Sequence, residues 1–283
     1  MNLRLAYSTN AYTRFDLSEA LTRVANLGYA GVELMADAPH LWPAETSKEQ
    51  SLAVRRALDR LGLTISNVNA FMMNRVGDPR HPYWYPSWIE SDAGRRRIRA
   101  EHTKAALSMA RELGAPHITT EPGGPLEENM KHRTGMERFI EALKPMVEHA
   151  ERTGVALLVE PEPGLLIERF EQYLELAERI DSPFLGLNFD VGHAFCVGQQ
   201  PEDWVAQMAA HTRHYHLEDI AASRVHRHLV PGEGAIDFGA TLRAIERSGY
   251  SGWLTVELYP YVDDPDGAGT AAKRHLERNA AGQ

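Results

Sequence analysis

The stretch VALLVEPEPGLLIERFEQYLELAERIDSPFLGLNFD, residues 155–190, decides the fold. It opens with an apolar, strand-forming run at 155–160, continues with apolar residues at helical spacing over 168–180, and closes with a second apolar run at 185–190. An amphipathic helix between two buried strands is typical of a unit in which the two strands run parallel. We therefore predict a parallel sheet covered by helices.

The same alternation continues along the whole chain. Strands are predicted at residues 3–8, 31–35, 64–70, 117–120, 155–160, 185–190, 214–218 and 253–258. Helices are predicted at residues 17–27, 48–61, 94–113, 134–152, 168–180, 201–210, 238–248 and 271–278. Several of the predicted helices are followed by a glycine, such as Gly62 and Gly114, which can adopt the left-handed conformation that ends a helix.

Eight strand–helix repeats in 283 residues favour an α/β fold of one kind, a single (β/α)8 TIM barrel spanning residues 1–283. The longest connection, at about 72–93, carries Tyr83, Trp84, Tyr85 and Trp88. We interpret this loop as a lid or a contact in a homo-oligomer, or, with equal weight, as a segment that packs over the barrel rim.

Composition narrows the class of function. The chain has 30 basic and 39 acidic residues and a net charge of −9, which argues against nucleic acid as a partner. No apolar run approaches the ~20 residues that span a membrane, and the N-terminal residues lack the pattern of a secretory signal. The single cysteine, Cys196, fits a reducing compartment, so we expect a cytoplasmic enzyme. The cluster Arg95, Arg96, Arg97 and Arg99 is interpreted as a solvated helix face.

Four predicted strands end on residue types that bind metals, namely Glu160, Asp190, His216 and Glu257. The carboxyl ends of barrel strands meet at one face, where active sites lie, so these four side chains are predicted to converge. Three carboxylates and one imidazole suit a single divalent ion, Mn²⁺, Mg²⁺ or Co²⁺, with Zn²⁺ as a further option.

A second group of histidines lies close to these positions. His193 follows Asp190 in the pattern D-x-x-H, and His226 and His228 would point the same way from an extended loop. The three imidazoles could hold a second ion, or they could bind substrate oxygens, and the sequence leaves both interpretations open.

Weaker candidates follow other strands. Glu162 and Glu121 are predicted either to orient substrate or act as an acid, or to form loop salt bridges. Glu33 could reach the barrel mouth and contact the ligand or orient a residue that does. The glycine pairs Gly123-Gly124 and Gly232-x-Gly234 lack a phosphate-binding pattern, which favours an unphosphorylated polyol or keto-sugar as substrate.

The segment HLEDIAASRVHRHLVPGEGAIDF, residues 216–238, taken with VEPE, FDVGH and TVELYP, resembles the xylose-isomerase-like TIM-barrel superfamily over nearly the whole chain. That superfamily includes sugar epimerases and isomerases, inosose dehydratases and endonucleases of the endonuclease IV type. The resemblance to its epimerase branch implies one metal on the four strand-end residues, with Glu160 and Glu257 as proton-transfer bases on opposite faces of the substrate. It also implies that His193 and Arg224 hold sugar oxygens.

The endonuclease branch has a similar stretch, in which an aspartate and two histidines bind a third zinc. This chain carries His226 in place of that aspartate, and Asn69 and Glu121 in place of two histidines that complete another zinc. The trinuclear zinc site is therefore not expected, and Asn69 and Glu121 become candidates for substrate binding.

The predicted reaction is proton transfer next to a carbonyl, in which a divalent ion stabilises the enediolate. Return of the proton gives epimerisation or isomerisation, and loss of a β-hydroxyl gives dehydration. We predict a metal-dependent isomerase or epimerase acting on a sugar or cyclitol. One alternative is a lyase that uses His193, His226 or His228 as its acid. The other is a zinc-dependent phosphodiester hydrolase.

Overall fold

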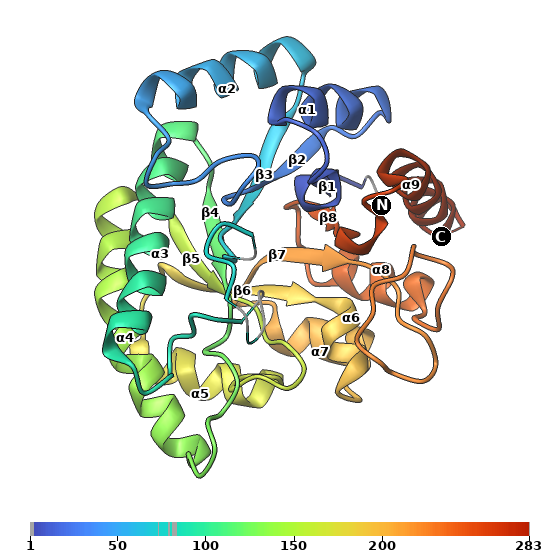
Figure 1. Ribbon diagram of the computed structural model, residues 1–283. Helices are drawn as coiled ribbons and strands as arrows, with labels where there is room; N and C mark the ends of the chain where they lie inside the picture. The colour runs from blue at the N-terminus through green and yellow to red at the C-terminus, as the bar shows by residue number, and fades with distance from the viewer. Residues whose placement is uncertain (1–2, 73, 79, 81–83, 283) are drawn as a thin grey trace.

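The computed structural model describes residues 3–72, 74–78, 80 and 84–282. Eight parallel strands close into a barrel in chain order, with β1 paired to both β2 and β8 (Figure 1). The strands are β1 (Leu5–Ser8), β2 (Gly31–Met35), β3 (Thr64–Asn69), β4 (His117–Thr120), β5 (Ala156–Val159), β6 (Leu185–Asp190), β7 (Thr212–Leu217) and β8 (Leu254–Val256). The predicted TIM barrel is confirmed, and each predicted strand overlaps an observed one.

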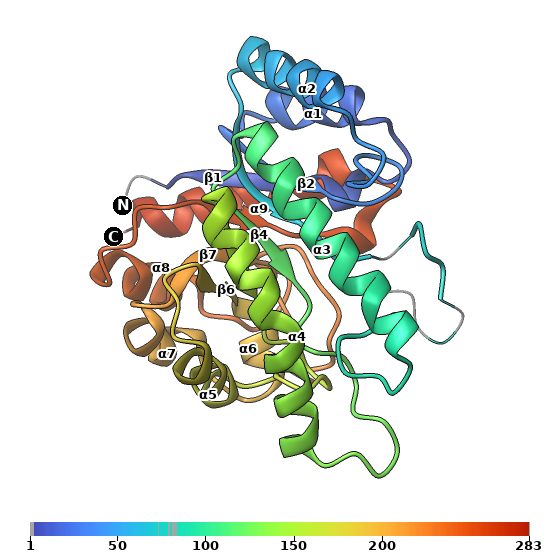
Figure 2. The same ribbon diagram turned by 90° about the vertical axis from the view of Figure 1, so that its left-hand side faces the viewer.

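Helices surround the barrel over the described residues. They are α1 (Leu17–Asn26), α2 (Lys48–Leu61), α3 (Ala93–Leu113), α4 (His132–Thr153), α5 (Phe170–Ile180), α6 (Val191–Cys196), α7 (Pro201–Met208), α8 (Phe238–Arg247) and α9 (Pro265–Ala281), with 3-10 turns η1 (Thr9–Tyr12) and η2 (Tyr259–Tyr261). Figure 2 shows α3 and α4 side by side along the outside of the barrel. The sequence did not predict α6, whose first turn is capped by Asp190, a residue that also ends β6.

Helix ends follow the predicted turn chemistry. Gly62 and Gly114 have φ of 69° and 79°, in the left-handed region that ends α2 and α3. The start of α9 was predicted too late, because Gly267 and Gly269 weaken the helical pattern. In the structure, Asp264 accepts a hydrogen bond from the Gly267 amide at 3.0 Å and begins the helix there.

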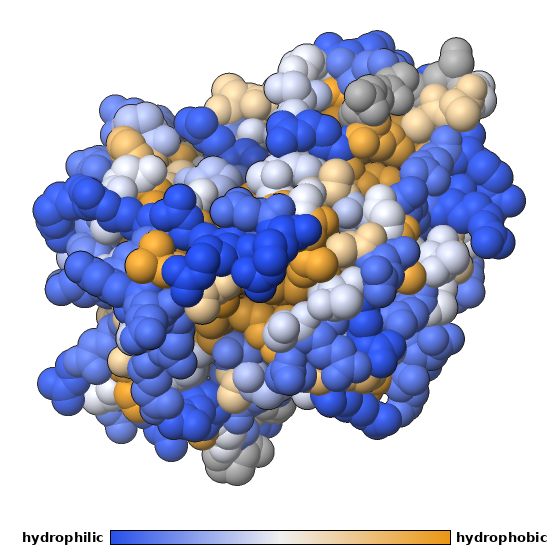
Figure 3. Space-filling view, turned by 90° about the horizontal axis from the view of Figure 1, so that it is seen from above, coloured by the Kyte–Doolittle hydropathy of each residue, from blue (hydrophilic) through white to orange (hydrophobic). Residues whose placement is uncertain are grey.

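The face that carries α1 and α2 is mostly hydrophilic, and hydrophobic residues gather in a furrow near its centre (Figure 3).

The interpretation of the basic cluster at 95–99 as a solvated helix face is wrong for Arg99. This residue is completely buried and donates from Nε to the Pro86 carbonyl at 2.8 Å. Periodicity alone missed this because Arg99 begins the buried stripe of α3. None of the helices formed by described residues is both long and apolar enough to cross a membrane.

The loop at about 72–93 packs partly over the barrel rim. Trp88 is completely buried, donates from Nε1 to the Thr120 hydroxyl at 3.2 Å and lies against Phe139. The guanidinium carbon of Arg80 lies over the Tyr85 ring, 3.7 Å from the ring centroid. Tyr83 lies outside the described residues.

Candidate metal centre

A cavity of 260 Å³ lies at the carboxyl ends of the strands. It is lined by three aromatic residues, three glutamates, three histidines and a proline: Phe71, Trp84, Tyr259, Glu160, Glu162, Glu257, His193, His226, His228 and Pro163. No lysine or arginine lines it within the described part of the chain. The cavity is therefore acidic and aromatic.

Four of the predicted residues meet at its floor. Glu160 follows β5, Asp190 ends β6, His216 lies in β7 and Glu257 follows β8, and their donor atoms lie within 4.8 Å of one another. His216 Nδ1 is 2.8 Å from Glu160 Oε1, 3.6 Å from Glu257 Oε2 and 3.8 Å from Asp190 Oδ2. The pairing of Asp190 with His216 across β6 and β7 holds two of the four in register.

This grouping concentrates negative charge in a buried place. Burial raises the pKa of Glu257 well above its ordinary value, and the neighbouring Glu160 and Glu33 add to that effect against the attraction of His216. Burial also raises the pKa of Asp190 to about 6. The pKa of His216 is raised well above its usual range because its carboxylate neighbours outweigh its burial. Such a set of buried carboxylates fits a divalent cation, which would neutralise them.

Glu33, from β2, orients the histidine. Its Oε2 accepts from His216 Nε2 at 2.7 Å and from Asn67 Nδ2 at 2.7 Å. Burial works to raise the pKa of Glu33, but His216 and His214 lower it well below its usual range. A carboxylate on Nε2 fixes the proton there, so Nδ1, which faces the three other carboxylates, can bind an ion once it gives up the proton that it shares with Glu160.

Glu257 also accepts hydrogen bonds from two asparagines that are not among the described residues lining the cavity. Its Oε1 accepts from Asn10 Nδ2 at 2.8 Å and from Asn69 Nδ2 at 3.1 Å, so Oε2 is the oxygen that faces His216. Asn69 thus contacts a candidate ligand and is not among the described residues that line the cavity. Asn10, which lies in η1 directly after β1, was not predicted, because it belongs to no motif.

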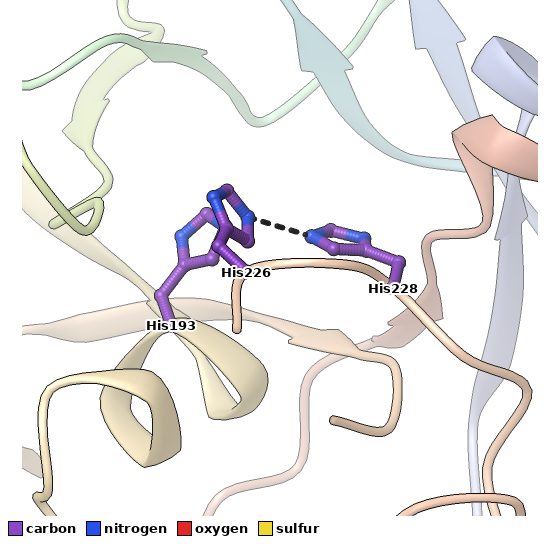
Figure 4. Close-up of side chains that lie close together, drawn as sticks. All are labelled: His193, His226 and His228. Carbon is purple, nitrogen blue, oxygen red and sulfur yellow. Dashed lines mark hydrogen bonds between the residues drawn. The ribbon is translucent and has the colours of Figure 1, made fainter. Parts of the chain in front are cut away.

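His193, His226 and His228 form a second cluster (Figure 4), and their donor atoms also lie within 4.8 Å of one another. His226 Nε2 lies 3.2 Å from His228 Nε2. The Nδ1 atoms of His193 and His228 each lie 3.0 Å from a carbonyl oxygen, that of Pro161 and Glu257 respectively. Because a carbonyl only accepts, each Nδ1 carries the proton and each Nε2 keeps its lone pair. Burial lowers the pKa of all three, so the imidazoles stay neutral.

The remaining candidates separate into two groups. Glu162 lines the cavity, accepts from Trp84 Nε1 at 2.9 Å, and has a pKa raised well above its ordinary value by burial. Glu121 is buried 3.9 Å from the Arg99 guanidinium, and Arg224 donates to the Phe195 carbonyl at 2.8 Å. Neither Glu121 nor Arg224 is among the described cavity-lining residues.

Glu218 was also missed. It is completely buried and lies within 4.8 Å of Asp190 and His228 donor atoms, and burial together with the neighbouring Asp190 raises its pKa well above its ordinary value. A Cβ at Gly192 would lie 1.9 Å from Glu218 Oε1, which explains the glycine in D-x-x-H. The available signal was the period of two in β7, which puts His214 and His216 on one face and, continued one residue past the strand, adds Glu218.

Comparisons with known proteins agree with this architecture. A family model described as a xylose isomerase-like TIM barrel matches residues 21–278. The fructoselysine 3-epimerase of Escherichia coli O157:H7 is 25% identical, over 95% of this chain and 94% of that protein. The inosose dehydratase of Geobacillus thermodenitrificans is 23% identical, over 91% and 88%.

Solved structures show the same fold. A D-tagatose 3-epimerase-like protein superposes with a TM-score of 0.81 at 22% identity, covering 99% of both chains. The IolI protein, solved with a zinc atom, gives a TM-score of 0.79 at 19% identity, again over 99% of both chains. At 22% and 19% identity, these two likenesses show the fold alone.

Proposed function

The chain belongs to the xylose isomerase-like TIM barrel family, and from that premise we propose that it is a divalent-metal-dependent isomerase or epimerase of a sugar or cyclitol. The observation that carries the proposal is the convergence of three buried carboxylates on Nδ1 of His216, whose Nε2 is held by Glu33. The epimerase and dehydratase among the relatives support the same class of chemistry.

Glu160, Asp190, His216 and Glu257 would hold the ion. Three oxygens and one nitrogen suit Mn²⁺, Mg²⁺ or Co²⁺, and zinc, the metal in the IolI structure, is a further option. When bound, such an ion stabilises the negative charge that develops on a carbonyl oxygen during proton abstraction.

The chain's own residues would move the proton. Glu160 and Glu257 both line the cavity and come from different strand ends, β5 and β8, so they can approach one substrate from two sides. We assign them as the two proton-transfer groups, a role that typically contributes ~10²–10⁴-fold to the rate. Asn10 and Asn69 hold Glu257 Oε1 and so fix the direction of its other oxygen.

The substrate is proposed to be unphosphorylated. No cationic side chain among the described residues lines the cavity, so a phosphate would lack a partner, whereas Phe71, Trp84 and Tyr259 offer aromatic faces for the C–H groups of a sugar ring. Glu162 can bind hydroxyl groups, and His193 can do so through Nε2 where that atom holds no ion. Arg224, Glu121 and Asn69 lie outside the cavity lining, and we propose support roles for them instead of substrate contact.

A second ion is proposed at His193, His226 and His228. The observation that favours it is that carbonyls hold the Nδ1 protons of His193 and His228, as is usual for histidines that bind metals. Three neutral imidazoles with a free fourth position suit zinc.

A dehydratase is the second candidate function. It would use the same ion and base but would need an acid beside the departing hydroxyl. Glu162 lines the cavity with a pKa raised well above its ordinary value, so it would keep a proton to donate, and this supports the alternative. A phosphodiester hydrolase is less well supported, since no cation lines the described part of the cavity.

Incubation in deuterated water with a panel of ketoses and keto-cyclitols, with and without phosphate groups, tests the proposal. Solvent deuterium at a carbon next to the carbonyl, with product of the same mass otherwise, supports an epimerase or isomerase. Loss of water points to the lyase, and turnover of phosphorylated compounds alone contradicts the proposed substrate class.

Two further properties stay proposals. Cytoplasmic location rests on the single cysteine, Cys196, and assembly into a homo-oligomer rests on the aromatic loop at about 72–93.

A further inference from the structure

We propose that Asp219 is a positioning residue that anchors the loop at 220–236 and thereby sets His226 and His228 over the cavity, an inference that rests on the binding role proposed for these histidines. Asp219 lies two residues after the end of β7 and is 1% exposed. It is not among the described residues that line the cavity. It acts through the loop.

The carboxylate of Asp219 accepts four backbone hydrogen bonds. Oδ1 accepts from the amides of Ile220 at 2.9 Å and Ile236 at 3.1 Å, and Oδ2 accepts from those of Gly232 at 2.8 Å and Gly234 at 2.9 Å. One of these donors lies at the entrance of the loop and three lie at its exit. The carboxylate therefore ties the two ends of the loop together.

The main chain of Asp219 continues this tie toward the histidines. Its amide donates to the Leu229 carbonyl at 2.8 Å, and its carbonyl accepts from the Leu229 amide at 2.7 Å. The Ala235 amide donates to the Ile220 carbonyl at 2.9 Å. Since Leu229 follows His228 in the chain, these hydrogen bonds fix the main-chain position from which the His228 side chain extends.

The two glycines of PGEG, residues 231–234, let the main chain come close enough for their amides to donate to this carboxylate. A Cβ at Gly234 would lie 2.3 Å from Asp219 Oδ1 and 2.4 Å from the Ile220 carbonyl oxygen. Gly232 has φ of 100°, and a Cβ there would lie 2.3 Å from His275 Nδ1. The motif resembles the backbone nests that bind anions, but its anion is the protein's own side chain. This accounts for a glycine pattern that has no phosphate to bind.

The four hydrogen bonds end in the loop and its borders, whereas the four candidate ligands below come from strand ends. Removing the charge of Asp219 should therefore release His226 and His228 without disturbing Glu160 or His216. In Asp219→Asn the amide nitrogen would face two backbone donors, so two hydrogen bonds are lost at once.

The test compares Asp219→Asn with Asp237→Asn, a matched control that removes the charge of the residue capping α8 at the loop's border. Hydrogen exchange is followed in peptides covering 226–237 and in those covering β5 to β8, and zinc per chain is counted after dialysis against Zn²⁺. We expect Asp219→Asn to speed exchange at Leu229 and Ala235 at least ~10-fold, with strand protection unchanged, and to weaken the second zinc by about 10–100-fold. The control should match wild type in both.

Unchanged exchange in the loop, or loss of protection in loop and strands together, would overturn the proposal. His226→Ala calibrates the loss of the second ion, because it removes a donor and leaves the anchor of Asp219 in place. If the wild type binds only one ion, the second-ion part of the proposed function fails, while loop exchange still decides whether Asp219 positions the loop.

Discussion

Replacing Glu33 by glutamine should weaken metal binding, although Glu33 acts through His216 and is not one of the four candidate ligands. Glu33 Oε2 accepts from His216 Nε2 at 2.7 Å, and glutamine has the same shape without the charge. Hydrogen bonds to a charged group are roughly twice as strong as neutral ones, and loss of such an orienting carboxylate typically costs about 10–100-fold in metal affinity. Each tenfold change corresponds to ~1.4 kcal/mol, so we expect a loss of about 1.4–2.8 kcal/mol.

The assay is titration of the metal-free protein with Mn²⁺ in competition with a fluorescent chelator. Glu49→Gln, at an exposed position in the first turn of α2, is the control for a change in net charge. Glu33→Asp keeps the charge but shortens the reach, and should give an intermediate Kd. A Kd for Glu33→Gln equal to that of wild type, in a protein that melts normally, would refute the assigned orientation of His216.

Other perturbations follow from the same geometry. Glu257→Gln should keep a folded barrel but lower turnover by ~10²-fold or more, since the base is lost, and wild-type activity would remove its assigned role. Metal affinity should fall as the pH drops from 7 to 5, because protons compete for Asp190, whose pKa is raised to about 6, and for Glu257 and His216, whose pKa values are raised well above their ordinary ranges; an affinity that stays constant over that range would contradict this. At an ion concentration of 1,000 times Kd, chelation should remove ~4 kcal/mol of stability and lower Tm by about 10 °C, and calorimetry that shows equal melting would argue against a structural ion. Gly192→Ala should displace Glu218, whose Oε1 would lie 1.9 Å from the new Cβ, and so weaken binding through the adjacent Asp190, which the chelator titration would detect.

The fold could be predicted from the sequence because each strand–helix unit carries its own signals. Apolar runs, helical spacing and turn glycines such as Gly62 are local, and the barrel follows from their repetition. Helix α6 was missed because it is short and its cap, Asp190, is also the last residue of a strand. Its local pattern therefore pointed to the strand alone.

The candidate site was only partly predictable. Residues at strand ends, such as Glu160 and His216, could be grouped because barrel topology brings those ends together. Glu33 was predicted to orient a ligand-binding residue but not which one, and Asn10 was not predicted, because both contacts join separate strand ends and no local pattern marks them. Arg224 shows the opposite case, because its motif suggested substrate contact while its guanidinium lies over Phe195.

Metal-dependent proton transfer is tested most directly by the metal content of the purified protein, measured together with deuterium exchange at the carbon next to a substrate carbonyl. We expect at least one divalent ion per chain, lost in His216→Ala, and exchange that disappears with it. A protein that binds no divalent ion, or that exchanges equally well after chelation, would contradict metal-dependent proton transfer.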